Sequence, residues 1–122
     1  MEDQETRVRA VAAPAVITMP SEIDITNAPQ LGQELAAAFA PGVGTVIADM
    51  TLTTFCDSSG VRVLALAHKQ AAADHAELRV VAPTAAVLRI FELTGVDQLL
   101  PIYPSLDAAR AGAGGPEGAE LA

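Results

Sequence analysis

VIADMTLTTFCDSSGVR, residues 46–62, is the stretch that decides the fold, because an apolar strand pattern changes there into a polar loop and then into a helical pattern. Residues 46–48 predict a short buried strand, and residues 53–55 continue extended. Residues 57–59, DSS, are of the types that cap helices. A helix N-terminus has unpaired N–H groups and the positive end of the helix dipole. We therefore expect this loop to favour a hydroxyl, a phosphate or a carboxylate.

The helix after this loop is expected to run from about Ser58 to Asp74. Its spacing places one apolar stripe on the sheet, made of Val61, Leu64, Ala65, His68 and Ala72. A second apolar group, Val63, Leu66 and Ala67, falls on another side, so the first half of the helix is apolar nearly all round. Two explanations stay open: deep burial, or an exposed partner-binding patch next to Ser58.

The segments before the loop predict two strands and a helix. A weak period-two pattern over residues 7–12 and the β-branched run Ala15–Met19 suggest the two strands of a hairpin. Residues 22–26, EIDIT, then alternate between polar and apolar side chains. The following helix is expected to open on a capping box of Asn27 and Gln30, with Thr26 an equally good cap, and to end at residues 41–42.

The segments after the second helix predict two more strands and two more helices. Residues 77–82 and 99–103 read as strands, separated by a helix that starts at Pro83–Thr84 and ends at Gly95 in a left-handed conformation. Ser105 is expected to cap a last short helix. We expect one domain over residues 1–111 and a disordered, acidic, Gly-rich tail over 112–122.

Composition narrows the function. The formal charge of −8, from 15 acidic and 7 basic residues, disfavours nucleic acid or an anionic membrane as the main partner. No apolar run approaches the ~20 residues that span a bilayer, and the N-terminus is too polar for a signal peptide, so a soluble, cytoplasmic protein is expected. The single cysteine, Cys56, excludes an intramolecular disulfide and a zinc-binding thiolate cluster. We expect no metal and no cofactor.

Three segments together resemble the STAS family, and specifically bacterial anti-sigma factor antagonists. They are SEIDITNAPQL at 21–31, FCDSSGVRVL at 55–64 and PTAAVLRIFELTGVDQLLPIYPSLDAA at 83–109. The resemblance covers roughly residues 8–110. It implies an α/β fold with a mixed β-sheet of four to five strands and about four helices packed mainly on one side.

The resemblance also implies partner switching. The unmodified antagonist binds an anti-sigma factor that is also a serine kinase, and phosphorylation of the loop serine breaks the complex until a PP2C-type phosphatase resets it. By position, the phosphoacceptor is Ser58, and Ser59 supports the helix start. Asp24 matches an acidic position near the loop. The chain is expected to be a monomer or weak dimer and not an enzyme.

The expected partner-binding surface combines the loop with the adjoining helix face. It comprises Asp24, Asp57, Ser58, Ser59, Gly60, Arg62, Val63 and Leu66. Arg62 stands where many family members have a small residue, and Ser21 replaces the usual glycine before Glu22. A phosphate on Ser58 adds about −1.5 to −2 charges, which an interface built around a neutral hydroxyl does not accept.

Two alternatives stay open. One is a STAS domain that binds constitutively without phosphorylation, as a transporter accessory or a stress-signalling scaffold. The other uses Cys56 and Arg62, whose CX5R spacing is that of cysteine-dependent phosphatases, in which a thiolate attacks phosphorus and the arginine holds the oxygens. Asp57 in that loop, Val63 after the arginine and the lack of an Asp-Pro general acid weigh against it.

Overall fold

A computed structural model describes residues 13–112 of the chain. Its elements, in order, are β1 (Ala15–Thr18), β2 (Glu22–Ile23), α2 (Ala28–Ala38), β3 (Thr45–Asp49), β4 (Phe55–Cys56), α3 (Ser58–Ala73), β5 (Glu77–Val81), α4 (Ala85–Thr94), the 3-10 turn η1 (Val96–Gln98), β6 (Ile102–Tyr103) and α5 (Leu106–Ala111). The strand expected within residues 7–12 lies outside the described residues, as does the tail expected over 112–122 apart from Gly112, which ends α5.

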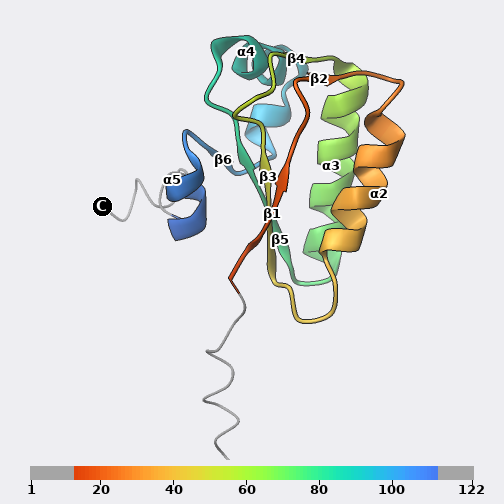
Figure 1. Cartoon of the computed structure of the whole chain (residues 1–122), viewed down its shortest axis with the longest axis vertical. Coiled ribbons are helices and arrows are strands. Elements are labelled where there is room, and N and C mark those ends of the chain that lie inside the picture. The colour runs from red at the N-terminus through yellow and green to blue at the C-terminus, as the bar shows by residue number, and fades with distance from the viewer. Residues whose placement is uncertain (1–12, 113–122) are drawn as a thin grey trace, which may run out of the picture.

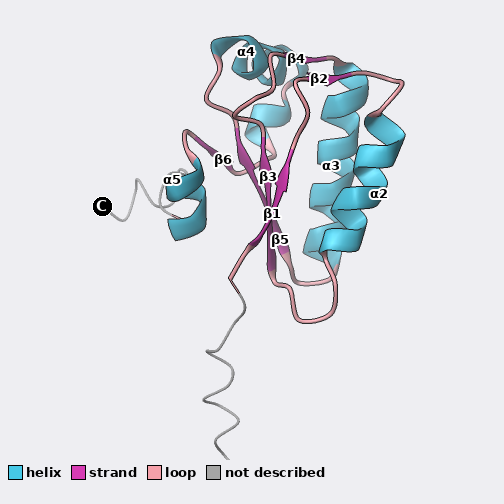
Figure 2. Ribbon diagram, viewed as in Figure 1, coloured by secondary structure: helices cyan, strands magenta, loops and turns pink. Residues whose placement is uncertain are grey.

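Within residues 13–112 the main sheet has four strands in the order β1-β3-β5-β6, with β3 and β5 in the centre. Every pairing among these strands is parallel; Val46, for example, lies opposite both Ala15 and Leu78. Parallel neighbours need crossover connections, which the helices supply. Within residues 13–112 the expected α/β class, the four helices and four of the expected four to five strands in one sheet are confirmed (Figure 2). In place of the expected mixed sheet, these strands pair in parallel throughout. The last strand is shorter than expected, because the N–H groups of Leu99 and Leu100 still donate to the Val96 oxygen of η1, at 2.9 and 3.0 Å.

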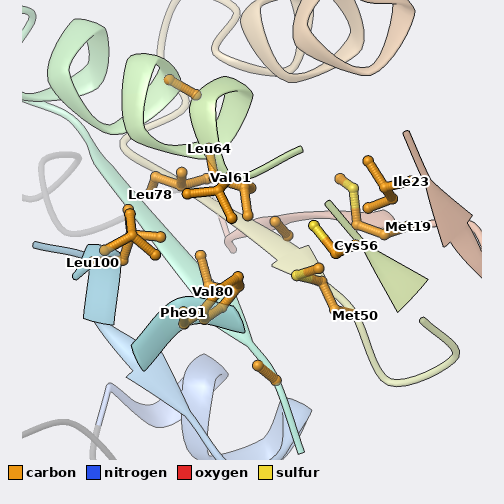
Figure 3. Packing of buried hydrophobic residues seen from close by; sticks show 14 of the residues in the cluster. Met19, Ile23, Met50, Cys56, Val61, Leu64, Leu78, Val80, Phe91 and Leu100 are labelled. Carbon is orange, nitrogen blue, oxygen red and sulfur yellow. The ribbon is translucent and has the colours of Figure 1, made fainter. Parts of the chain in front are cut away.

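The side chains of the central strands alternate between two apolar layers, as strands buried on both faces require. Val46 and Leu78 face α2, α3 and α4, in a core that also contains Phe91 (Figure 3). Ile47 and Val81 face the other way. There they meet α5, which lies on the side of the sheet opposite α2 and α3 (Figure 1). The helices therefore cover mainly one face, as expected.

The position of α5 depends on Arg79 of β5. Its Nη1 donates to the backbone oxygen of Ala109 at 2.7 Å, and its Nη2 pairs with Glu77 at 3.0 Å. The guanidinium also lies 6.0 Å from the centre of the Tyr103 ring. Cations near a helix C-terminus interact favourably with its free carbonyl groups. Arg79 therefore holds the last turn of α5 against the sheet.

The inward face of α3 differs from the expected one. Val61 and Leu64 are buried as predicted, but Ala72 is exposed, and Ala67 and Ala71 lie on the buried side instead. Ala65 and His68 are only partly buried. The reason is that α3 packs against α2 as well as against β5, so its buried face is turned toward the neighbouring helix.

Candidate functional site

Two short strands bring the first and second motifs together. β2 and β4 pair in parallel, with Ile23 opposite Cys56, and the Asp57 N–H donates to the Ile23 oxygen at 3.1 Å. Asp24 and Asp57, which follow directly on the two strands, consequently lie close enough for their charges to interact. The pairing also orients the strands: Ile23 and Cys56 are buried, whereas Glu22 and Phe55 face out.

Asp57 begins α3 by capping it. Its Oδ1 accepts from the N–H groups of Ser59, at 2.9 Å, and Gly60, at 3.4 Å, and also from the Ser59 hydroxyl. The Ser59 hydroxyl does most to hold the pKa of Asp57 below its ordinary value, and Asp24 acts weakly in the opposite direction. The negative charge expected at this helix start is thus supplied by the chain's own carboxylate.

Asp24 is held by its own turn. The hydroxyl and the N–H of Thr26 both donate to Asp24 Oδ1, the latter at 2.9 Å, and together they lower its pKa. The capping box predicted for Asn27 is wrong. Asn27 is the N-cap residue of α2, but its side chain turns back to accept from the Asp24 N–H at 3.0 Å and to donate to the Glu22 oxygen at 2.8 Å. It shapes the Asp24 turn and leaves the helix start without a side-chain cap.

Ser58 is the first residue of α3 and is exposed. Its neighbour Ser59 is bound to Asp57, but the Ser58 hydroxyl has no hydrogen-bond partner within residues 13–112. Because the cap is already made by Asp57, Ser58 is not needed to start the helix. Its hydroxyl is therefore free for chemistry from outside.

Gly60 allows α3 to begin directly against the two short strands. A Cβ at this position would lie 2.6 Å from the Cys56 Sγ and 2.7 Å from the Ile23 Cγ2. Both distances are far shorter than van der Waals contact. Gly60 is therefore a packing residue beneath the loop, and its own surface is buried.

Cys56 is a core residue that lies among Met19, Ile23 and Met50 (Figure 3). Burial, with a smaller effect of Asp57, raises the pKa of its thiol to about 11. The thiolate that a CX5R phosphatase needs is thus disfavoured at neutral pH. The amides that would cradle a phosphate are taken by Asp57. The protonated thiol and the occupied amides both weigh against the phosphatase alternative.

The remaining predicted residues lie along the first turns of α3. Arg62 is exposed and Leu66 is 53% exposed. Val63 is only partly buried and lies next to Gly32 of α2. A shallow groove of about 280 Å³ separates the two helices here and is lined by Pro29, Gly32, Gln33, Ala36, Val63, Leu66, Ala67 and Gln70. The apolar first half of α3 thus divides: Ala67 is buried, and Leu66 remains on the surface.

Sequence reasoning missed exposed apolar residues beside the loop. Ile25, directly after Asp24, is 72% exposed, and Phe55, directly before Cys56, is 50% exposed. Phe55 lies across from Glu22 on the outward side of the β2–β4 pair. The period-two alternation in EIDIT contained part of this signal, but the side on which Phe55 lies follows only from the pairing of two distant segments.

No helix within residues 13–112 is long and apolar enough to cross a membrane. The same residues contain no group of three or more His, Cys, Asp or Glu side chains placed to hold a metal ion.

Known proteins are similar to this chain in sequence and in fold. BtrV of Bordetella bronchiseptica, provisionally named an anti-sigma factor antagonist, is 33% identical over 89 residues, which are 73% of this chain and 77% of BtrV. The crystal structure of an anti-sigma factor antagonist from Mycobacterium paratuberculosis matches with a TM-score of 0.73 and 32% identity, over 80% of this chain and 82% of that one.

More distant structures share the fold. The unphosphorylated form of the anti-sigma factor antagonist SpoIIAA matches with a TM-score of 0.66 and 23% identity, over 81% of this chain and 87% of that one. Its phosphorylated form, described as a Bacillus cell-fate determinant, matches with a TM-score of 0.60 and 22% identity, over 81% of this chain and 90% of that one. The model of the STAS domain matches residues 5–109, which include every element from β1 to β6 and most of α5. The chain belongs to the STAS domain family.

Proposed function

We propose that this protein is an anti-sigma factor antagonist whose binding is switched at Ser58. With Ser58 unmodified, it binds an anti-sigma factor that has serine kinase activity; phosphorylation of Ser58 by that kinase releases it, and a PP2C-type phosphatase restores binding. The observation that carries the proposal is the Ser58 hydroxyl, exposed and unpaired within the described residues at a helix start that Asp57 already caps.

The surroundings of Ser58 support a surface for a protein partner. The exposed side chains of Phe55 and Ile25 supply apolar area, and Asp24 and Asp57 supply negative charge next to it. Aromatic residues are enriched at the centre of protein interfaces. A complementary partner surface would carry an apolar pocket and hydrogen-bond donors for these two carboxylates, with no donor to spare for a further anionic group.

Electrostatics supports phosphorylation as a release signal. A phosphate would add about −1.5 to −2 charges between partner and antagonist, where Asp24 and Asp57 are already anionic. Leaving a charge unmatched in an interface costs several kcal/mol, against roughly 8 kcal/mol for a micromolar complex. Such a loss is enough to separate the two proteins.

The relatives support the same assignment. BtrV and the Mycobacterium structure bear the name anti-sigma factor antagonist, each above 30% identity and across most of this chain. SpoIIAA, which shares the fold, was solved both with and without phosphate. A protein with this fold can therefore exist in a phosphorylated form, which supports the proposal.

The test is a pull-down from the source cell with the full chain, with and without ATP, followed by intact-mass measurement of the bait. We expect an anti-sigma factor bound without ATP, and with ATP a released bait that has gained one phosphoryl group. Ser58→Ala should bind but gain no phosphate, whereas Ser59→Ala should still be modified. Phosphate gained by Ser58→Ala would refute the site. Undiminished binding of Ser58→Asp would favour a phosphorylation-independent binding module.

A further inference from the structure

Arg62 lies one helical turn beyond Ser58 on the same face of α3. Residues four apart on a helix are neighbours, and helical side chains lean toward the N-terminus, so a long side chain at 62 reaches back over position 58. Both residues are exposed. Within residues 13–112 Arg62 makes no ion pair, unlike Arg79, which is bound to Glu77. The structure thus holds an uncommitted guanidinium one turn from the hydroxyl.

A phosphate on Ser58 would find two donors of this helix start already occupied. The Ser59 and Gly60 N–H groups, which an anion at a helix start ordinarily uses, donate to Asp57 Oδ1 at 2.9 and 3.4 Å. The neighbouring carboxylates, Asp57 and Asp24, both have lowered pKa values and repel the new charge. A cation on the outer face of α3 would offset this repulsion.

We infer that Arg62 is the intramolecular counter-ion of phosphorylated Ser58. The guanidinium folds back along α3 and binds two phosphate oxygens, as arginine does with phosphate generally. This inference rests on the proposed phosphorylation of Ser58 and adds the residue that receives the modified group. It also gives the switch a second effect: phosphorylation adds negative charge and at the same time withdraws the positive charge of Arg62 from the partner-binding surface.

The test uses the full chain with phosphoserine incorporated at position 58 during translation, so that no kinase is required. Phosphorus NMR follows the second ionisation of the phosphate, whose ordinary pKa is about 6. A bound guanidinium favours the dianion and lowers this pKa. We expect Arg62→Ala to raise it by roughly 0.2 to 0.4 pH unit relative to the chain with Arg62. Arg62→Lys, which keeps the charge but loses the two-point contact, should restore part of the difference.

Arg89→Ala is the matched control. Arg89 is exposed on α4, so this substitution removes the same charge from another helix. It should leave the phosphate titration unchanged. A thermal-unfolding cycle gives a second readout: phosphoserine should lower the melting temperature more in Arg62→Ala than in the chain with Arg62. The inference is overturned if Arg62→Ala does not shift the titration, or if Arg89→Ala shifts it equally. Failure of the native chain to accept phosphate from its partner would count against the proposed function and leave this measurement standing.

Discussion

Gly60 and Cys56 are in such close contact that α3 can begin where it does only with a glycine at position 60. A Cβ there would come within 2.6 Å of the Cys56 Sγ and 2.7 Å of the Ile23 Cγ2. Through this contact the core beneath β2 and β4 determines how closely the first turn of α3 approaches these two strands. The capping carboxylate of Asp57 and the hydroxyl of Ser58 are positioned by the same helix start.

We therefore expect Gly60→Ala to destabilise the protein. The added methyl group must displace two core side chains, and overpacking of this kind costs about 1–3 kcal/mol. Gly32→Ala is a matched control, because a Cβ there would lie 3.6 Å from Val63, which is ordinary contact. In a helix, that change gains up to about 1 kcal/mol. Urea unfolding of the two variants measures both effects, and equal stability of the two would contradict the role given to Gly60.

Asp57 should make stability depend on pH in the acid range. Its pKa is lower in the folded chain than its ordinary value of about 3.9, so the folded state binds fewer protons than the unfolded state. Its stabilising contribution is present above about pH 4 and is lost as the pH falls through the folded-state value.

Asp57→Asn should accordingly be less stable at neutral pH and lose less stability between about pH 5 and pH 2. Asp74→Asn, an exposed change at the other end of α3, provides the comparison. Chemical denaturation at a series of pH values gives both curves. A slope for Asp57→Asn as steep as that of the unmutated chain would show that this carboxylate is not the titrating cap.

Cys56 should behave as an inert core thiol. Burial raises its pKa to about 11, against about 8.5 for an exposed cysteine, so the folded state retains a proton that the unfolded state loses. The stability that this provides is fully present below about pH 8.5 and is lost as the pH rises toward the folded-state value. Iodoacetamide should react slowly with the native chain at pH 7.5 and rapidly in urea.

The phosphatase alternative is checked with the same residue. No turnover of p-nitrophenyl phosphate above that of a Cys56→Ser variant is expected, because the thiol is protonated and the loop amides are occupied. Fast native alkylation together with turnover that depends on Cys56 would revive that reading.

The sequence predicted the features of the site that depend on neighbouring residues. The cap types at 57–59, the glycine that ends α4 and the Ser105 cap of α5 are local preferences, and the structure contains a cap at Asp57, a left-handed Gly95 and a hydrogen bond from the Ala108 N–H to the Ser105 hydroxyl. Local preference was misleading at Asn27, which was predicted to cap α2 with its side chain. That side chain instead binds the backbone of Glu22 and Asp24, which compete for it with the helix start.

The features that escaped prediction depend on distant contacts. β4 contains two residues, too few for a period-two signal, and only its pairing with β2 shows that Phe55 faces outward. The buried face of α3 turns toward α2, which no pattern within α3 could show. Likewise the placement of α5 across the sheet depends on Arg79 of β5 binding the Ala109 carbonyl, 30 residues away.

Phe55 provides the last prediction, on the partner-binding surface itself. The ring is half exposed and lies outside the core, so Phe55→Ala should change the free energy of unfolding by less than about 1 kcal/mol. If the ring enters a pocket of the anti-sigma factor, its loss should weaken the complex by about 2 kcal/mol or more, a reduction in affinity of roughly thirtyfold. Leu93→Ala, on α4 and 69% exposed, controls for the loss of apolar surface in general and should bind normally. Calorimetric titration of both variants with the captured partner separates the cases: equal affinities would place the interface elsewhere, whereas loss restricted to Phe55→Ala places it over the β2–β4 pair, next to Ser58.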